Sequence, residues 1–290
     1  MTNIFVIGAG RTATALITYL LNNSAEQSWN VTVGDFDHNL AEQKIAGHQS
    51  GRAIKFNALN DEQRGREISE ADIVISFLPP DMHELIAKEC LKNKTNMITA
   101  SYVSPGMMKL DEDVKRSGLI FLNEMGLDPG IDHMDVMQLK EKVESEDGKI
   151  ISLKSFCGAL ITPESDNNPW HYKFTWSPMN VVLAGQANAR YKENSKIKEV
   201  PYSQLFLNTE QIEVPGLGTF EAYPNRDSVS YIKKYNLNGV ENFYRGTLRR
   251  PGYSEAWNTL VRLGLTDNKK LIKNAQQFLH FNKISGGLGL

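Results

Sequence analysis

The stretch IFVIGAGRTA, residues 4–13, determines the fold class predicted for this chain. It opens with the apolar run Ile4–Ile7, which is typical of a strand buried on both faces. Small residues then recur at Gly8, Gly10 and Ala13. Leucines and isoleucines at helical spacing follow, so the small residues lie between a predicted strand and a predicted helix. That context makes an otherwise weak G-x-G-x-x-G/A match specific.

Each small residue has a physical role in such a turn. Gly8 allows a tight bend, Gly10 lets the backbone approach a pyrophosphate, and Ala13 lets the helix pack closely on the strand. The free N–H groups at the start of the helix then hold the anion. The stretch therefore predicts a dinucleotide-binding loop, and the alternative is a glycine-rich turn of some other α/β protein.

Asp35 lies at the end of the second predicted strand, after Val33 and Gly34. A carboxylate there accepts hydrogen bonds from the ribose hydroxyls of NAD, and it repels the 2′-phosphate of NADP. Arg11 and Arg52 are nearby cations that would offset this repulsion, and a solvated loop aspartate is the alternative. The sequence therefore predicts NAD or NADP as the cofactor, with NAD favoured by Asp35.

Short apolar runs alternate with helical patterns over the first third of the chain. Strands are predicted at 4–7, 31–33, 53–56, 72–77, 97–100 and 119–122, with helices at 82–93 and 107–117 among the connections. This alternation implies right-handed βαβ units and a doubly wound parallel sheet covered on both faces, the Rossmann arrangement. We therefore predict a Rossmann dinucleotide-binding domain over residues 1–124.

The composition changes after this block. A helix is predicted from Asp128 and Pro129 to about Glu146, with Asp128 as its N-cap. The later segments are β-rich 149–160, a polar and aromatic loop at 162–176, strands at 212–214, 219–223 and 242–248, and a helix at 254–264. The alternating aromatic residues at 170–176 predict strand packing. We therefore expect a second α/β domain over 125–290, and an α/β fold class for the whole chain.

Composition excludes several classes of function. The chain has 290 residues, and its 32 Lys and Arg nearly balance its 34 Asp and Glu, which argues against a binder of nucleic acid or anionic membranes. No apolar run approaches the roughly 20 residues that cross a bilayer. The start does not resemble a signal peptide, and two distant cysteines, Cys90 and Cys157, suggest a reducing compartment. We expect a cytoplasmic protein with no nucleic-acid or membrane partner.

Several segments resemble the motifs of one family, the glutamate-forming saccharopine dehydrogenases, also called saccharopine reductases. They are ASYVSP (100–105), NEMGLDPGIDH (123–133), FCG (156–158), YKFTWS (172–177), PNRDS (224–228) and RGTLR (245–249). They occur in the same order as in the family. Together with the predicted dinucleotide-binding loop at Gly8–Ala13, called the glycine loop below, they extend the resemblance from Gly8 to about Gly264. Together these segments are far more specific than the glycine loop alone.

This resemblance implies a fold and an activity. The family has an N-terminal Rossmann domain and a second α/β domain that binds substrate and forms a homodimer. Its members interconvert saccharopine with glutamate and 2-aminoadipate 6-semialdehyde in lysine metabolism, by hydride transfer between a nicotinamide and the carbon of a C–N bond. The NADP-using relatives carry a basic and a hydroxyl residue where this chain has Gly34-Asp35-Phe36.

The family's ligand contacts carry over to named positions of this chain. The cofactor contacts become Gly8, Gly10, Arg11, Thr12, Asp35, Ser101, Leu127 and Ser177. The substrate contacts become Ser101, Tyr102, Asp128, Arg226, Thr247, Leu248 and Arg249. Saccharopine has three carboxylates, and arginine forks bind carboxylates well. The cluster of arginines at 226, 245, 249 and 250 therefore suits the small amino-acid substrate that the resemblance implies.

The implied reaction also needs a general acid and base near the amine. The candidates are Asp128 and Tyr102, with Cys157 behind them. Each has a structural alternative: Asp128 as a helix cap, Tyr102 as ordinary packing, and Cys157 as a small buried residue. No metal is expected, because no second ligand pair at metal spacing accompanies Asp132 and His133.

Two alternatives stay open. A carboxynorspermidine-type dehydrogenase, from a related branch, reduces a different imine, although Gly130–His133 favours the saccharopine branch. The other alternative is a short, inactive nucleotide-binding relative. The resemblance implies a helical third domain after the RGTLR segment and then a returning C-terminal segment, and neither is evident before Leu290. We therefore expect two domains in this chain.

Overall fold

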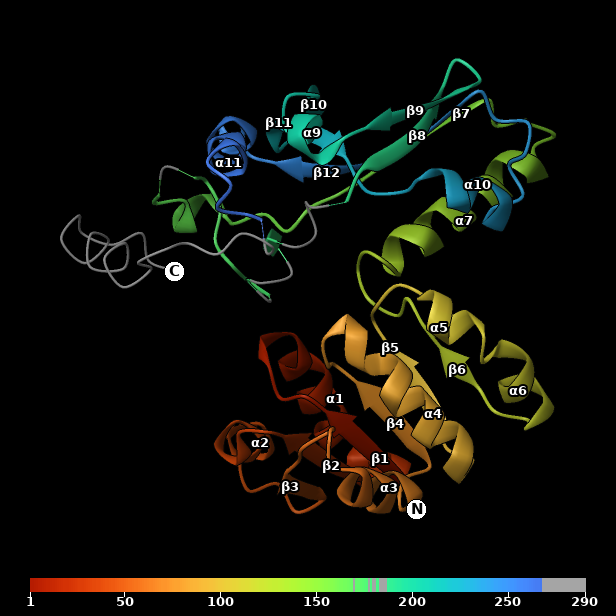
Figure 1. The fold of residues 1–290 in the computed structure, drawn as a ribbon, viewed down its shortest axis with the longest axis vertical. Helices are drawn as coiled ribbons and strands as arrows, with labels where there is room; N and C mark the ends of the chain where they lie inside the picture. The colour runs from red at the N-terminus through yellow and green to blue at the C-terminus, as the bar shows by residue number, and fades with distance from the viewer. Residues whose placement is uncertain (169, 177, 179–180, 183–186, 268–290) are drawn as a thin grey trace. The chain divides into compact units, whose positions relative to one another are not determined.

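The computed structural model describes residues 1–168, 170–176, 178, 181–182 and 187–267 (Figure 1). The chain divides into two compact units, and the division falls between Ile150 and Ile151. This division leaves helix α7 (Ile131–Ser145) with the first unit, whereas the domain boundary predicted after residue 124 precedes that helix.

The first unit is built on a six-stranded parallel sheet in the order β3-β2-β1-β4-β5-β6. Its strands are β1 (Thr2–Ile7), β2 (Trp29–Asp35), β3 (Gly51–Lys55), β4 (Ile73–Ser76), β5 (Asn96–Thr99) and β6 (Phe121–Leu122). The strand order reverses between β1 and β4, and ligands bind at such a point in open α/β sheets. The predicted Rossmann arrangement is confirmed.

Helices cover both faces of this sheet (Figure 1). They are α1 (Thr14–Gln27), α2 (His38–Ile45), α3 (Asp61–Ser69) and α4 (His83–Asn93). Because side chains alternate along a strand, β1 supplies both layers. Ile4 and Val6 pack in one core cluster with side chains of α1 and α2. Phe5 and Ile7 pack in the other with side chains of α3 and α4.

The segment predicted as one helix at 107–117 is two short helices, α5 (Pro105–Met108) and α6 (Asp111–Arg116). The hydroxyl of Ser104 accepts the Met107 N–H at 3.1 Å, and Pro105 takes the first helical position, so α5 begins earlier than predicted. A turn closed by the Leu110 N–H and the Met107 carbonyl then separates the two helices.

The prediction that Asp128 caps the following helix is wrong. Helix α7 begins at Ile131, its N-cap residue is Gly130, and no side chain caps it. The Asp128 carboxylate instead accepts a hydrogen bond from the hydroxyl of Tyr102. With 15 residues, α7 is the longest helix in the described part of the chain, and no helix there is long and apolar enough to cross a membrane.

The second unit contains a mixed sheet in the order β10-β11-β12-β8-β9, with β7 parallel to β12. Its strands are β7 (Ser152–Cys157), β8 (Ala189–Glu193), β9 (Lys196–Val200), β10 (Glu210–Val214), β11 (Gly218–Pro224) and β12 (Asn242–Arg249). Its helices include α9 (Tyr202–Leu205), α10 (Val229–Lys234) and α11 (Tyr253–Arg262). The strands predicted at 212–214, 219–223 and 242–248 and the helix predicted near 254–264 are confirmed.

The prediction that the aromatic segment at 170–176 packs as a strand is wrong for its backbone. Described residues of 162–176 form a short turn of 3-10 helix at Pro163–Ser165 and otherwise carry no strand. Its aromatic side chains nevertheless enter a core. Tyr172 is buried, and its ring lies 5.6 Å from Phe174 and 5.2 Å from Tyr253, centre to centre. Aromatic burial, and not strand pairing, therefore holds this loop.

Candidate functional site

The glycine loop at the end of β1 has the geometry that its sequence predicts. Gly8 has φ +101°, and its N–H donates to the carbonyl of Gly34 at 2.8 Å. A Cβ at Gly8 would lie 3.2 Å from the carbonyl oxygen of Phe77, whereas a Cβ at Gly10 would meet nothing within 4 Å. Ala13 is fully buried against the strand. Gly8 is thus needed for the turn, and Gly10 leaves room for a ligand.

A cavity of about 340 Å³ lies beside this loop. It is lined by residues that include Gly8, Asp35, Phe36, Asn57, Leu59 and Met82. Arg11 and Thr12 are exposed in the turn of 3-10 helix, Arg11–Ala13, that leads into α1. An open glycine loop, a helix start and an adjoining cavity fit one half of a dinucleotide.

Asp35 has partners in the chain itself. One carboxylate oxygen accepts the Ala9 N–H at 2.7 Å, and the other accepts the Asp37 N–H at 2.9 Å. The side chain therefore joins the glycine loop to the loop after β2, at the rim of the cavity. It places a carboxylate at the position where a ribose is predicted to bind.

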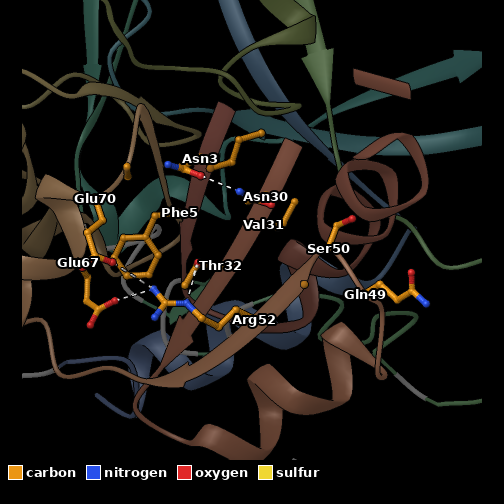
Figure 2. Close-up of a pocket in the computed structure, with 13 residues that line it drawn as sticks. Asn3, Phe5, Asn30, Val31, Thr32, Gln49, Ser50, Arg52, Glu67 and Glu70 are labelled. Atoms are coloured by element: carbon orange, nitrogen blue, oxygen red, sulfur yellow. Dashed lines mark hydrogen bonds and ion pairs between the residues drawn. The ribbon is translucent and has the colours of Figure 1, made fainter. Parts of the chain in front are cut away.

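Arg52 does not offset the charge of Asp35. Figure 2 shows its guanidinium bonded to Glu67, with Nη2 and Oε2 2.9 Å apart, and its Nε donating to the Thr32 hydroxyl at 3.3 Å. Arg52 pairs with Thr32 in the sheet, whereas the partner of Asp35 is Lys55, three residues further along β3. The expectation that Arg52 offsets Asp35 is therefore wrong, because α3 supplies its counter-ion.

Tyr102 and Asp128 meet at the carboxyl edge of this sheet. Tyr102 follows the end of β5, and its hydroxyl donates to Oδ1 of Asp128 at 2.6 Å. Asp128 lies in a tight loop closed by a 2.9 Å bond from the Gly126 N–H to the Pro129 carbonyl. The structure thus brings together two residues that are 26 positions apart in the sequence. Both are predicted from the sequence as candidates for the general acid and base.

The loop that carries Asp128 depends on a second glycine. Gly130 has φ +155°, and a Cβ there would lie 2.0 Å from the carbonyl oxygen of Gly126. The N–H of Gly130 donates to Asp132 at 2.8 Å. Leu127 stands at the tip of the loop with 57% of its surface exposed. Its predicted cofactor contact stays a prediction.

Sequence reasoning misses one buried residue near this edge, His83. Its Nδ1 lies 3.0 Å from the hydroxyl of Ser76, and its Nε2 lies 2.8 Å from that of Ser101 and 3.2 Å from that of Thr99. A lone histidine at a helix start belongs to no motif. Only the register of β4 and β5 brings these hydroxyls to one ring.

Strand β12 places two of the predicted substrate residues of the second unit on one sheet face. Thr247 and Arg249 alternate along it, and Cys157 of β7 is the register partner of Thr247. Tyr223 of β11 pairs with Thr247 from the other side. Leu248 lies between Thr247 and Arg249, so its side chain projects from the opposite face.

Arg249 is enclosed by aromatic rings. Its guanidinium carbon lies 4.9 Å from the ring centre of Tyr172, 5.1 Å from that of Tyr253 and 5.9 Å from that of Tyr223. Only 6% of the residue is exposed. One N–H donates to the Leu248 carbonyl at 2.9 Å, whereas Nε has no hydrogen-bond partner among the described residues. Burial raises the pKa of Tyr253, so that ring stays neutral.

The other arginines of the predicted cluster lie in different settings. Arg245 is buried over the ring of Tyr231 at 4.6 Å, and Arg250 lies 5.0 Å from that of Phe220. Arg226 has an exposed side chain in the turn after β11, where its carbonyl accepts the Arg190 N–H at 2.8 Å. Ser177, a predicted cofactor contact, lies outside the described residues.

Two carboxylates lie near His133, and such groups can hold a metal ion. His133 lies 3.7 Å from Glu124 and 3.6 Å from Asp132. The Glu124 carboxylate also accepts the Val103 N–H at 3.2 Å. These contacts tie the residues around Asp128 together, and no group of three or more metal-binding side chains occurs in the described parts of either unit.

Comparisons with known proteins identify the family of this chain. The saccharopine dehydrogenase NADP binding domain matches residues 4–122, and the saccharopine dehydrogenase C-terminal domain matches residues 126–288. The NADP(+), L-glutamate-forming saccharopine dehydrogenase of Schizosaccharomyces pombe is 36% identical over 280 residues, which are 96% of this chain and 60% of that protein. These names give no support to a preference for NAD.

Two further relatives extend the comparison. The mitochondrial alpha-aminoadipic semialdehyde synthase of Rattus norvegicus is 36% identical over 92% of this chain and 28% of that protein. The structure of apo saccharopine dehydrogenase (L-Glu forming) from Saccharomyces cerevisiae has a TM-score of 0.82 and 32% identity, over 92% of this chain and 59% of that one. This chain thus spans less than two thirds of the length of each of these three proteins. Since the two domain matches cover most of its length, the chain belongs to the saccharopine dehydrogenase family.

Proposed function

We propose that this chain is a glutamate-forming saccharopine dehydrogenase, an oxidoreductase of lysine metabolism that uses a nicotinamide cofactor. The observation that carries the proposal is the 2.6 Å hydrogen bond from Tyr102 to Asp128, in the unit that holds the glycine loop. A paired hydroxyl and carboxylate at the ligand-binding edge of a dinucleotide-binding sheet suit proton transfer beside a hydride transfer. Family membership supplies the substrate class.

The proposed reaction needs both steps. Oxidation removes a hydride from the lysine-derived carbon of the shared C–N bond and a proton from the nitrogen, which leaves an imine. Water adds to the imine carbon, and the C–N bond then breaks to release glutamate and 2-aminoadipate 6-semialdehyde. A bound nicotinamide supplies the hydride acceptor. The protein must accept the proton from the amine and return one to the departing nitrogen.

We assign those proton transfers to Asp128 and Tyr102. The carboxylate of Asp128 is the base, and the hydroxyl of Tyr102 fixes its orientation and relays the proton. Gly126 and Gly130 hold Asp128 in its tight loop, which supports a fixed geometry for the pair. Cys157 is not needed for this role, and its place beside Thr247 supports a contact with substrate.

Carboxylate recognition falls to the second unit. Arg249 is buried and keeps one N–H without a partner among the described residues, which suits a charge-assisted bond to a ligand carboxylate. Arg226 is exposed, and the PNRDS turn fixes its backbone. We propose that these two arginines bind carboxylates of saccharopine, with Ser101, Thr247 and the backbone of Leu248 as further contacts.

The cofactor is NAD or NADP, and we propose that Asp35 sets the balance between them. Gly8, Gly10, Arg11 and Thr12 are the proposed pyrophosphate contacts, and Ser101, Leu127 and Ser177 are proposed for the nicotinamide half. We further propose a cytoplasmic homodimer. The wide separation of Cys90 and Cys157 in the sequence supports a reducing compartment, and light scattering of the purified protein tests the dimer.

Kinetics of two variants test the proposed acid and base. Tyr102→Phe and Asp128→Asn should each lower kcat for saccharopine oxidation by about 10²–10⁴-fold, while the cofactor dissociation constant stays within about twofold. Tyr19→Phe, at an exposed tyrosine of α1, is the matched control and should keep full activity. Turnover of carboxynorspermidine in place of saccharopine, or full activity of Asp128→Asn, would overturn the assignment.

A further inference from the structure

The His83 ring is surrounded by hydroxyl groups at the carboxyl ends of two neighbouring strands. Ser76 is the last residue of β4, Thr99 is the last residue of β5, and Ser101 follows two positions later. All three hydroxyls lie within 3.2 Å of a ring nitrogen. The residue is 3% exposed, so these hydroxyls, and not water, satisfy the imidazole.

The ring is neutral at physiological pH. Burial lowers the pKa of His83 from 6.5 to about 4, although the nearby charge of Asp81 acts in the opposite direction. A neutral imidazole has one nitrogen that donates and one that accepts. His83 therefore bridges Ser76 on one side and Ser101 on the other, without placing a charge in the core.

This bridge reaches the acid–base pair through the backbone. Ser101 is followed directly by Tyr102. The carbonyl of Ser101 accepts the Glu124 N–H at 3.0 Å, and the carbonyl of Thr99 accepts the Met125 N–H at 3.1 Å. Residues 124 and 125 lead into the loop that carries Asp128. The segments on both sides of the Tyr102–Asp128 hydrogen bond are thus tied to the backbone that His83 holds.

We propose that His83 is a positioning residue: the contact of its Nε2 with the Ser101 hydroxyl fixes the segment that aligns Tyr102 with Asp128. Its catalytic consequence rests on the proposed function. His83 also fills space in the core. If packing were its whole role, the loss of activity would not depend on which ring nitrogen a substitution imitates. A dependence on the nitrogen therefore distinguishes positioning from packing.

Two amides of different length test this proposal, since glutamine places its amide near the position of Nε2 and asparagine near that of Nδ1. His83→Gln keeps the contact with Ser101 and should keep kcat within about threefold of the wild type. His83→Asn loses that contact, and its kcat should fall by at least about 30-fold, with the cofactor dissociation constant within about twofold. Adding Ser101→Ala to His83→Asn should lower kcat by less than Ser101→Ala does alone. Equal kcat values for the two amides, or fully multiplicative effects, would overturn the proposal.

A second measurement does not need activity. With ¹³Cζ-labelled tyrosine, assigned by Tyr102→Phe, the Tyr102 resonance reports its hydrogen bond to Asp128. We expect the resonance to move in His83→Asn and to keep its position in His83→Gln. An inactive wild type with this pattern would refute the proposed function and leave His83 as a positioning residue. A Tyr102 resonance that is unchanged in His83→Asn would overturn the positioning role. If both amide variants fail to fold, Ser101→Ala takes their place, and an unchanged Tyr102 resonance in that variant would overturn the role.

Discussion

Asp35 places both carboxylate oxygens on backbone N–H groups, those of Ala9 and Asp37, at the rim of the cavity beside the glycine loop. Asp35, which we propose selects between NAD and NADP, thus also holds the glycine loop in place. Lys55 is the register partner of Asp35 on β3, and its Nζ lies 5.8 Å from the ring centre of Phe36. We propose that the charge at this rim decides whether a 2′-phosphate is tolerated.

Replacing Asp35 with serine should shift cofactor preference toward NADP. Serine still offers an oxygen to the Ala9 N–H, but it removes the negative charge that repels a phosphate. The ratio of dissociation constants for NADPH and NADH, from fluorescence titration, should fall by about tenfold, or about 1.4 kcal/mol. Asp37→Ser, at the next acid of the loop, is the control and should change the ratio by less than about twofold. An unchanged ratio in Asp35→Ser would show that Asp35 does not discriminate between the two cofactors.

His83 makes stability depend on pH in a direction that its lowered pKa fixes. The folded protein binds the proton less tightly than the unfolded chain, whose histidine has a pKa of 6.5. The stability is therefore fully present above about pH 6.5 and is lost as the pH falls toward 4. Between pH 7 and pH 5 the loss amounts to about 2 kcal/mol.

Urea denaturation at the two pH values measures this effect. His83→Gln should lose about 2 kcal/mol less than the wild type between pH 7 and pH 5, because glutamine does not titrate. His38→Gln, at a histidine of α2 whose side chain is 43% exposed, should keep the wild-type dependence. Identical pH dependence in His83→Gln and the wild type would mean that the ring is not buried in its neutral form.

At the scale of elements, the Gly126–Gly130 loop decides where α7 begins and where Asp128 lies. Its backbone returns on itself, with the Gly126 N–H bonded to the Pro129 carbonyl and the Ile131 N–H bonded to the Gly126 carbonyl. A side chain at Gly130 would collide with that carbonyl. The loop therefore requires glycine for two reasons, a positive φ and a close backbone approach.

Gly130→Ala should destabilise the first unit and misplace Asp128. We expect a loss of about 1–3 kcal/mol in the free energy of unfolding by urea, and a lower kcat. Gly118→Ala is the matched control in the same unit, since Gly118 also has a positive φ, +68°, but has nothing within 4 Å of its Cβ position. It should cost about 1 kcal/mol. Equal losses in the two variants would show that the loop relaxes around a methyl group.

Elements with strong local patterns were predictable from the sequence. The apolar run of β1 and the small residues after it gave the sheet, and the motif segments gave Tyr102 and Asp128 as partners for one reaction. The hairpin of β8 and β9 was missed because its strands are rich in charged residues. Its turn signal, Asn194 and Ser195 with positive φ, is visible only in the structure.

The site was less predictable than the fold, because side chains meet through tertiary register. The role of Asp128 as a helix cap followed local rules that the tight loop overrides. Arg52 was close to Asp35 in the predicted sheet, but an ion pair with Glu67 on α3 holds it elsewhere. The contact of His83 with Ser101 joins positions 18 residues apart, and no local pattern encodes it.

The molecule as a whole consists of two compact units. The first holds the glycine loop, the Tyr102–Asp128 pair and the His83 bridge. The second holds Arg249 among its aromatic rings and Arg226 in its turn. We propose that hydride and proton transfer take place in the first unit and that the second unit binds the carboxylates. The chain spans about 60% of the fungal relatives, so its activity must be measured on the chain itself.

The most direct measurement uses saccharopine deuterated at the lysine-derived carbon of the C–N bond, with NAD and NADP in separate reactions. We predict that the purified chain forms reduced nicotinamide that carries deuterium, with glutamate and 2-aminoadipate 6-semialdehyde in equal amounts. Folded protein that binds the cofactor but transfers no deuterium with either nicotinamide would contradict the account.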